Sequence, residues 1–234
     1  MTRSMNFRIL LMLSVFASIS SCKKTDSSDV EEEVPIFQDY FVRYDKTSDT
    51  TVAMATFKTN DFSGDRLILT GQSSVSCNNE IGEYNSNVTN YFYRWESDGY
   101  VDCSFEYTKD ASRIYYNTIG YEERSEISFP DEIASFSLSE TTTYAWEESP
   151  LQPGESITFF LSQGQNSGSV IYNAQVGLEG VEIGPSSMSS LSAGQATLHV
   201  SRCVVFEELD QEDDSAGGRR VIEVKITKEV LLVD

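Results

Sequence analysis

Beyond the N-terminal segment, four side chains have the chemistry of a thiol nucleophile, a general base or a zinc ligand: Cys77, Cys103, Cys203 and the only histidine, His199. A dyad or a zinc site needs its members within hydrogen-bonding or coordination distance. His199 and Cys203 are separated by about 13 Å along a straight strand, which is too far for either. No Gly-x-Ser-x-Gly elbow presents a serine nucleophile. We therefore predict no catalytic residue, no bound metal and no cofactor, and we interpret His199 as a surface or interface residue.

Cys77 and Cys103 follow apolar residues at i−2, Val75 and Val101, which predicts that both face the core. In an oxidising compartment we expect them to form a disulfide, closing a loop of about 25 residues and contributing roughly 3 kcal/mol. The alternative is a pair of free buried thiols, because cysteine is a common small core residue. Trp95 lies between them, but their spacing is much shorter than in antibody domains, so the bridge would join neighbouring strands.

The N-terminus has the pattern of an export signal over residues 1–21: Arg3 and Arg8, the apolar stretch Ile9–Phe16, and a small-residue cleavage site. The apolar stretch is too short to remain as a transmembrane helix. Its end, Ile19–Cys22, resembles the bacterial lipobox, which implies that Cys22 is lipidated and anchors the chain permanently to a membrane. The alternative is an ordinary secreted protein whose Cys22 merely lies near the cut.

Residues 22–34 are polar and increasingly acidic, which predicts a flexible tether. Acidic residues shortly after a lipidated cysteine also resemble the surface-export signal of lipoproteins in the Bacteroidota. That resemblance implies a lipid-anchored protein of the cell envelope, at the outer membrane, facing either the periplasm or the cell surface.

The charge balance excludes one class of partner. The chain has 17 basic and 37 acidic side chains, and removing residues 1–21 leaves 15 basic against 37 acidic, a net charge of −22. Binding to phosphate backbones requires clustered Lys and Arg, so we exclude nucleic acid as a partner. We interpret the acidity as a solvated, self-repelling surface.

Alternating hydrophobicity with turn residues between the runs predicts an all-β fold. The clearest strand is Val101–Tyr107, whose odd-numbered residues are apolar or cysteine and whose even-numbered residues are polar. Further strands of a first unit are predicted at Phe37–Tyr44, Val52–Lys58, Arg66–Thr70, Asn90–Trp95 and Arg113–Thr118. Those of a second unit are predicted at Glu132–Leu138, Thr142–Trp146, Ser156–Leu161, Ser169–Asn173, Gln175–Leu178, Ala196–Glu207, Arg219–Thr227 and Glu229–Val233.

The segment Ser128–Asp131 is the predicted boundary, because proline interrupts strand pairing there. We expect an N-terminal β-sandwich over residues 35–130 and a C-terminal one over residues 131–234. The region resembles a group of uncharacterised bacterial lipoproteins with two immunoglobulin-like β domains, which implies that fold and carries no activity. The resemblance rests on Ala55–Phe57, Leu67–Gly71, Phe129–Pro130, Leu151–Ser156 and Leu191–Leu198.

Two acidic loops, Asn60–Asp65 and Glu207–Asp214, have oxygen ligands of the kind that calcium binds, but neither fits the EF-hand pattern. We favour plain polar loops, and expect the loop Glu208–Gly218 to be exposed, mobile and removable. Thr50 and Ser215 lie in Asp-Thr-Thr and Asp-Ser-Ala triplets that resemble the O-glycosylation sequon of the Bacteroidota, and both are candidate glycosylation sites.

The aromatic residues separate two hypotheses about function. Tyr91, Tyr93, Trp95 and Tyr100 could form a carbohydrate platform, although alternation at 91, 93 and 95 favours one core face. We expect a non-catalytic binding, adhesion or scaffold protein with a protein or glycan partner. The alternative is a surface glycan-processing enzyme or an accessory carbohydrate-binding protein. The side of the sheet that Trp95 and Trp146 face decides between them.

Overall fold

The computed structural model describes residues 24–85, 93–130, 133–164 and 166–234, and it confirms the all-β class. Within these ranges, the helical elements are short 3₁₀ turns: η1 (Ser27–Asp29), η2 (Tyr121–Glu123) and η3 (Pro185–Met188). None of the described helices is long and apolar enough to span a membrane. The strands that precede residue 120 are β1 (Lys24–Asp26), β2 (Ile36–Asp45), β3 (Thr50–Thr59), β4 (Arg66–Ile68), β5 (Ser74–Cys77), β6 (Glu80–Ile81), β7 (Tyr93–Asp98), β8 (Cys103–Thr108) and β9 (Ile114–Ile119). The later strands are β10 (Ser135–Ser137), β11 (Thr142–Ala145), β12 (Glu155–Gln163), β13 (Asn166–Asn173), β14 (Gly180–Ile183), β15 (Gly194–Phe206) and β16 (Gly218–Val233).

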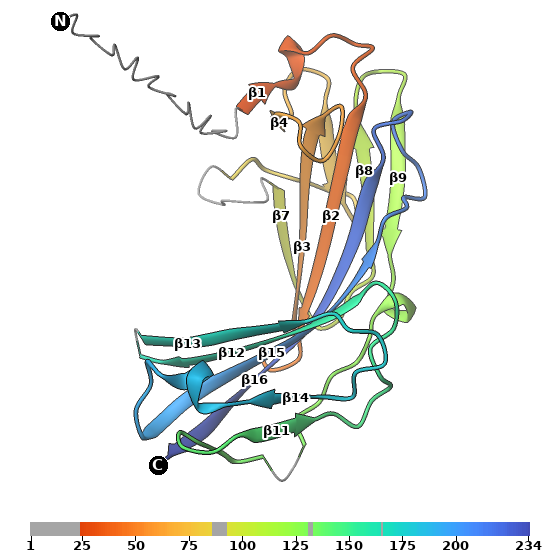
Figure 1. Ribbon diagram of the computed structural model, residues 1–234. Coiled ribbons are helices and arrows are strands. Elements are labelled where there is room, and N and C mark those ends of the chain that lie inside the picture. Colours follow the sequence, from red (N-terminus) through yellow and green to blue (C-terminus); the bar gives the residue numbers. More distant parts are fainter. Residues whose placement is uncertain (1–23, 86–92, 131–132, 165) are drawn as a thin grey trace, which may run out of the picture.

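One ten-stranded sheet, here called the long sheet, runs through the molecule in the order β1-β4-β3-β2-β16-β15-β12-β13. β7 pairs with β3, and β10 pairs with β16. At its centre the antiparallel hairpin of β15 and β16 is joined to β2 by a parallel pairing, in which Gly218–Lys225 lie beside Gln38–Asp45. The sheet bends near this junction, so that β2, β3 and β7 form one arm and β12 and β13 the other (Figure 1).

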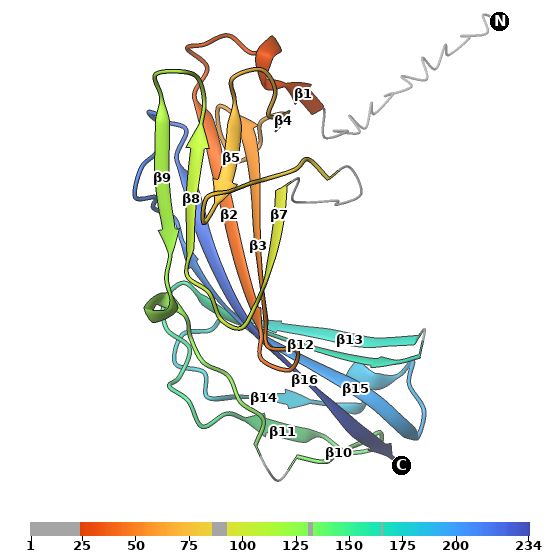
Figure 2. The same ribbon diagram turned by 180° about the vertical axis from the view of Figure 1, so that it is seen from behind.

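Two small sheets cover one face of the long sheet. The sheet β6-β5-β8-β9 packs on the first arm and the pair β11-β14 on the second, and both are seen from behind in Figure 2. Alternation explains the arrangement, because the even-numbered residues of β15 and β16, such as Leu198, Val200 and Ile226, are buried under these sheets. The odd-numbered residues point to the opposite face, here called the open face, which lines the inner side of the bend.

The buried side chains form two hydrophobic cores instead of one. Val204 and Ile222 belong to the first core, whereas Val200 and Val224 belong to the second. Between them the core-facing position of β15 is occupied by Arg202, which interrupts the apolar stripe. The hairpin of β15 and β16 therefore contributes to both cores, and the boundary at residue 130 stays a prediction.

The flexible tether predicted for residues 22–34 is wrong over its described part. β1 pairs in parallel with β4, joining Lys24–Asp26 to Arg66–Ile68. Val30 and Val34 then pack against the first core. The composition of this segment gives no sign of order, because its strand is held by pairing with a distant strand and not by an apolar face of its own.

Several predicted strands are confirmed within one or two residues, including those at β2, β3, β8 and β9. The stretches Arg219–Thr227 and Glu229–Val233 are one continuous strand, β16. Gln175–Leu178 was predicted wrongly, since the strand in this region is β14, a few residues later. A 3₁₀ turn, η3, occupies the serine-rich stretch after Pro185.

Candidate functional site

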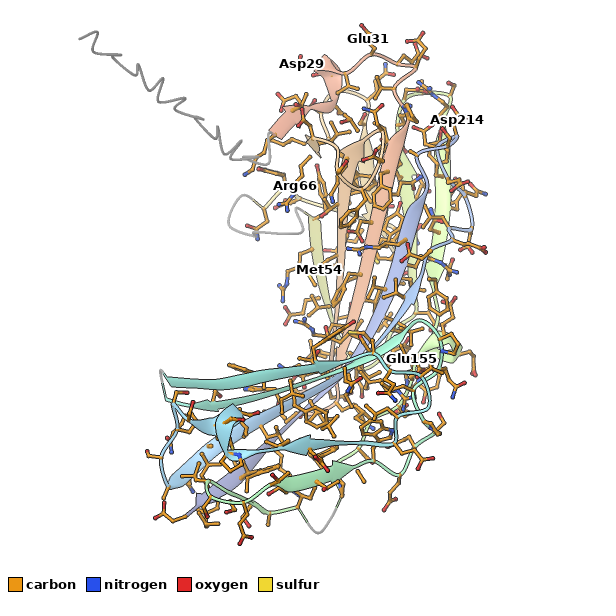
Figure 3. All side chains as sticks on the ribbon, viewed as in Figure 1. Asp29, Glu31, Met54, Arg66, Glu155 and Asp214 are labelled. Atoms are coloured by element: carbon orange, nitrogen blue, oxygen red, sulfur yellow. The ribbon has the colours of Figure 1, made fainter. Side chains whose placement is uncertain are left out.

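The open face of the long sheet has no covering layer in the described structure. Seven adjacent strands contribute to it, and strands lie about 4.8 Å apart with a rise of about 3.3 Å per residue. Eight residues of each strand then give an area on the order of 800 Å², which is about what one partner contributes to a standard protein interface. Met54 on β3, labelled in Figure 3, lies on this face.

Ion pairs cross the open face in a ladder between β2 and β16. Arg219 binds Asp39 at 3.0 Å, Arg43 binds Glu223 at 2.7 Å, and Lys225 binds Asp45 at 3.1 Å. In each pair the two residues are direct neighbours in the parallel register.

At the edge of the open face, Arg94 binds Glu96 on β7 at 2.6 Å. Each cation in the ladder and at this edge therefore has an anionic partner. The face is nearly neutral on a chain whose formal net charge is −20.

Apolar side chains lie among these ion pairs. Phe41, Val52 and Met54 are half-buried on neighbouring strands. Near the upper end, Phe62 is 53 % exposed, and its ring lies 3.8 Å from Lys58 Nζ and 4.8 Å from the Arg219 guanidinium carbon. An exposed aromatic ring between two cations is the type of residue that is enriched at the centre of protein interfaces.

At the bend, the open face has a shallow hollow of about 300 Å³ lined by Arg43, Phe160, His199, Ser201, Glu223 and Lys225. His199 stacks on Phe160 with 5.5 Å between ring centroids. Its Nδ1 lies 3.1 Å from Thr227 Oγ1 and its Nε2 lies 3.5 Å from Ser162 Oγ. Partial burial, followed by the charge of Lys225, lowers the pKa of His199.

The hollow lacks the arrangement that activates a serine nucleophile, because neither ring nitrogen of His199 contacts a carboxylate in the described structure. The imidazole is mainly neutral at pH 7, since its pKa is below the ordinary value of 6.5. Neutral imidazole has one donor and one acceptor nitrogen. The side chains of the hollow can therefore exchange hydrogen bonds and charge-assisted contacts with a partner.

The cysteines lie on two different faces. Cys77 and Cys103 are buried in the first core on β5 and β8, as their spacing predicts, and both are free thiols in the structure. A hydrogen bond with Cys103, together with burial, raises the pKa of Cys77 far above its ordinary value. The expected bridge between them stays a prediction. Cys203 lies on the open face, where burial raises its pKa to about 12.

The tryptophans point into the cores. Tyr93 and Trp95 are buried in the first core and Trp146 in the second, with exposures of 3, 7 and 5 %. The indole nitrogen of Trp95 donates a hydrogen bond to the carbonyl oxygen of Glu80 at 2.9 Å. Tyr91 lies outside the described residues, and Tyr100 is half-buried. Tyr93 and Trp95 therefore belong to the core face and not to an exposed platform.

The acidic loop between β15 and β16 is exposed over much of its length, as predicted, but it is anchored to the body at Asp213. Asp213 is only 1 % exposed and accepts hydrogen bonds from Lys109 Nζ, the Tyr115 hydroxyl and the Ile36 amide at 2.6, 2.6 and 2.8 Å.

Two further residues of the loop bind the free edge of β9. The carboxylate of Asp210 accepts a hydrogen bond from the Thr118 amide, and the side-chain oxygen of Gln211 accepts one from the Tyr116 amide. At the end of the loop, a Cβ on Gly218 would lie 2.4 Å from the Gln38 carbonyl oxygen, so glycine is needed there. The acidic composition of the loop does not predict these contacts, because the partner residues are 90 or more positions away in the sequence.

A second buried ion pair lies at the bend. Arg202 is 1 % exposed and donates to Glu155 Oε2 at 2.5 Å and to the carbonyl oxygens of Glu126 and Pro150. Glu155, labelled in Figure 3, also accepts from the Ser125 hydroxyl. Alternation along β15 places Arg202 among core-facing residues, at the junction between the two cores.

The remaining candidate sites lie in loops, except Thr50, which begins a strand. In Asn60–Asp65, the Asp61 carboxylate accepts hydrogen bonds from the amide and hydroxyl of Ser63. No group of three or more His, Cys, Asp or Glu residues suited to a metal ion is found in the part of the chain that the structure describes. Thr50 is half-buried at the start of β3 and Ser215 is exposed in the acidic loop. Their glycosylation stays a prediction, as does lipidation of Cys22, which lies outside the described residues.

No family model matches this chain, and a search of curated proteins finds no relative.

Proposed function

We propose that this chain is a lipid-anchored protein of the bacterial envelope, tethered through Cys22, that binds a protein partner on its open face without catalysing a reaction. In this proposal the two arms are immunoglobulin-like β-sandwiches that share the β15–β16 hairpin. The observation that carries the proposal is the uncovered face of the long sheet, on which apolar side chains alternate with neutralised charges.

The composition of this face favours a protein over a glycan. Glycan sites use exposed aromatic rings as platforms, but Trp95 and Trp146 are buried, and the exposed rings Phe62 and Tyr172 lie on different arms of the sheet. Protein interfaces instead combine half-buried apolar residues with ion pairs over a broad surface. The near neutrality of the face also supports recognition, because a partner meets little of the repulsion that the rest of an acidic protein generates.

The binding proposal is tested by photocrosslinking in intact cells. A photoreactive phenylalanine analogue replaces Val52 or Tyr172, both on the open face, or Ile81 as a control that lies on β6 and is 73 % exposed. We expect discrete protein adducts from the first two positions and none from the third. Introducing Met54→Asp, which places an unpaired charge on the face, should abolish these adducts. Equal adducts from all positions would contradict the proposal.

The anchor is tested separately by fractionation. Cys22→Ala should release the protein from membranes into the soluble fraction, whereas the control Cys203→Ala should remain bound. Membrane association of the Cys22→Ala variant would refute the lipid anchor and leave the crosslinking result standing on its own.

A further inference from the structure

The folded chain begins very close to the proposed lipid anchor. Only Lys23 separates Cys22 from Lys24, the first residue of β1. Consecutive Cα atoms are 3.8 Å apart, so the Cα atom of Cys22 lies at most about 7.6 Å from that of Lys24. A lipid on Cys22 is therefore held within a few ångströms of β1.

The segment after β1 is fastened to the body and does not serve as a spacer. The Ser27 hydroxyl accepts a hydrogen bond from the Thr70 amide at 2.8 Å, and the Ser28 amide donates to Thr70 Oγ1 at 3.2 Å. Further along, Arg113 donates to the carbonyl oxygen of Glu32 at 2.9 Å. These hydrogen bonds, together with the packing of Val30 and Val34 against the first core, oppose release of the segment.

These contacts lie at one end of the molecule, here called the anchor end, formed by β1, η1 and the turns at 70–73 and 110–113. Asp29 and Glu31 mark this end in Figure 3, far from Glu155 at the bend. Beyond the bend, β16 continues to the end of the second arm, and its 16 residues have a contour length of about 50 Å. The second arm is therefore remote from Cys22.

We propose that the anchor end lies against the lipid headgroups and that the bend, the second arm and the lower part of the open face are held away from the bilayer. This inference rests on the proposed lipid attachment at Cys22. The short covalent link to the lipid on Cys22, and not electrostatic attraction, holds the anchor end at the bilayer. Asp29 and Glu31–Glu33 would be repelled by anionic lipids. Zwitterionic headgroups are the surface that this end fits.

The test measures energy transfer from two fluorophore positions to acceptor-labelled lipids. The purified lipidated protein is reconstituted in phosphatidylcholine vesicles and labelled at Gln72→Cys, at the anchor end, or at Glu140→Cys, in the second arm. Both positions are exposed, and the parent protein labelled in parallel corrects for Cys203. A matched variant of each carries 20 Gly/Ser residues between Lys23 and Lys24, a spacer of about 25 Å root-mean-square length.

We expect strong transfer from position 72 and weak transfer from position 140. The spacer should abolish most of this difference while membrane binding is unchanged. Equal transfer from the two positions in the protein without a spacer would overturn the proposed orientation even with acyl chains present. Absence of acyl chains on Cys22, measured by mass spectrometry of the same sample, would overturn the lipid anchor and with it the orientation.

Discussion

Replacing Asp213 with asparagine removes the charge from the buried carboxylate of the acidic loop. Asp213 neutralises Lys109, whose side chain is 9 % exposed, and holds the Tyr115 hydroxyl and the Ile36 amide. The asparagine has the same shape, but one of its two polar atoms is an NH₂ group, which would face either the Tyr115 hydroxyl or the Lys109 and Ile36 donors. The variant therefore leaves the buried Lys109 ammonium without an anionic partner, and at least one of the groups that Asp213 holds loses its hydrogen bond.

Breaking a buried ion pair from one side typically costs about 3–5 kcal/mol. The lower end of that range applies here, because Lys109 keeps a hydrogen bond to the carbonyl oxygen of Val34 at 2.8 Å. We therefore expect Asp213→Asn to lower the free energy of unfolding by about 3 kcal/mol. Adding Lys109→Met should recover part of this loss, because it removes the ammonium that Asp213→Asn leaves without an anionic partner.

Urea denaturation followed by tryptophan fluorescence measures this effect, because Trp95 and Trp146 report the two cores. The matched control is Glu212→Gln, which removes a charge from the same loop at an exposed position and should change stability by no more than about 0.5 kcal/mol. If Asp213→Asn and Glu212→Gln were equally stable, the loop would be a passive connection and the role assigned to Asp213 would be wrong.

The other predictions concern the bend and the titrating groups. Arg202→Met should lower the free energy of unfolding by about 3 kcal/mol in the same denaturation experiment, because Glu155 is left buried without its partner; an unchanged midpoint would contradict this. NMR titration of His199 should give a pKa below 6.5. As the pH falls, the unfolded chain then binds a proton at this residue before the folded chain does. The stability contributed by neutral His199 is therefore present above pH 6.5 and declines below it. A pKa above 6.5 would reverse that sign. Mass spectrometry of unreduced protein from the envelope should find Cys77 joined to Cys103 and Cys203 free, whereas a bridge to Cys203 would be inconsistent with its place on the open face.

Alternating hydrophobicity along the chain predicted most of the local structure, namely the strands and the faces of their side chains. It located β8 and assigned the core-facing side of Cys103, and it placed Tyr93 and Trp95 on one buried face. These predictions succeed because a strand with one covered face must alternate, whatever its partners are. The same reasoning put His199 and Cys203 on the uncovered side of β15.

Features that depend on distant partners were beyond this reasoning. β1 is polar, and its strand exists through pairing with β4 some 40 residues later. Asp213 has the composition of a solvated loop, yet it is buried because Lys109 and Tyr115 come from β8 and β9 and their turn. The parallel pairing of β16 with β2 is likewise absent from any local pattern, because parallel and antiparallel strands alternate alike.

The sharing of β15 and β16 between the two cores has a consequence for how the protein denatures. Unfolding of either arm would remove the packing from one half of the continuous β15–β16 hairpin and expose the edge of β2 or β12. Each arm therefore depends on the other for strands as well as for contacts, and the pair should behave as one cooperative unit. Heating should give a single calorimetric transition, and a destabilising change at either end of the molecule should lower the temperature of that one transition.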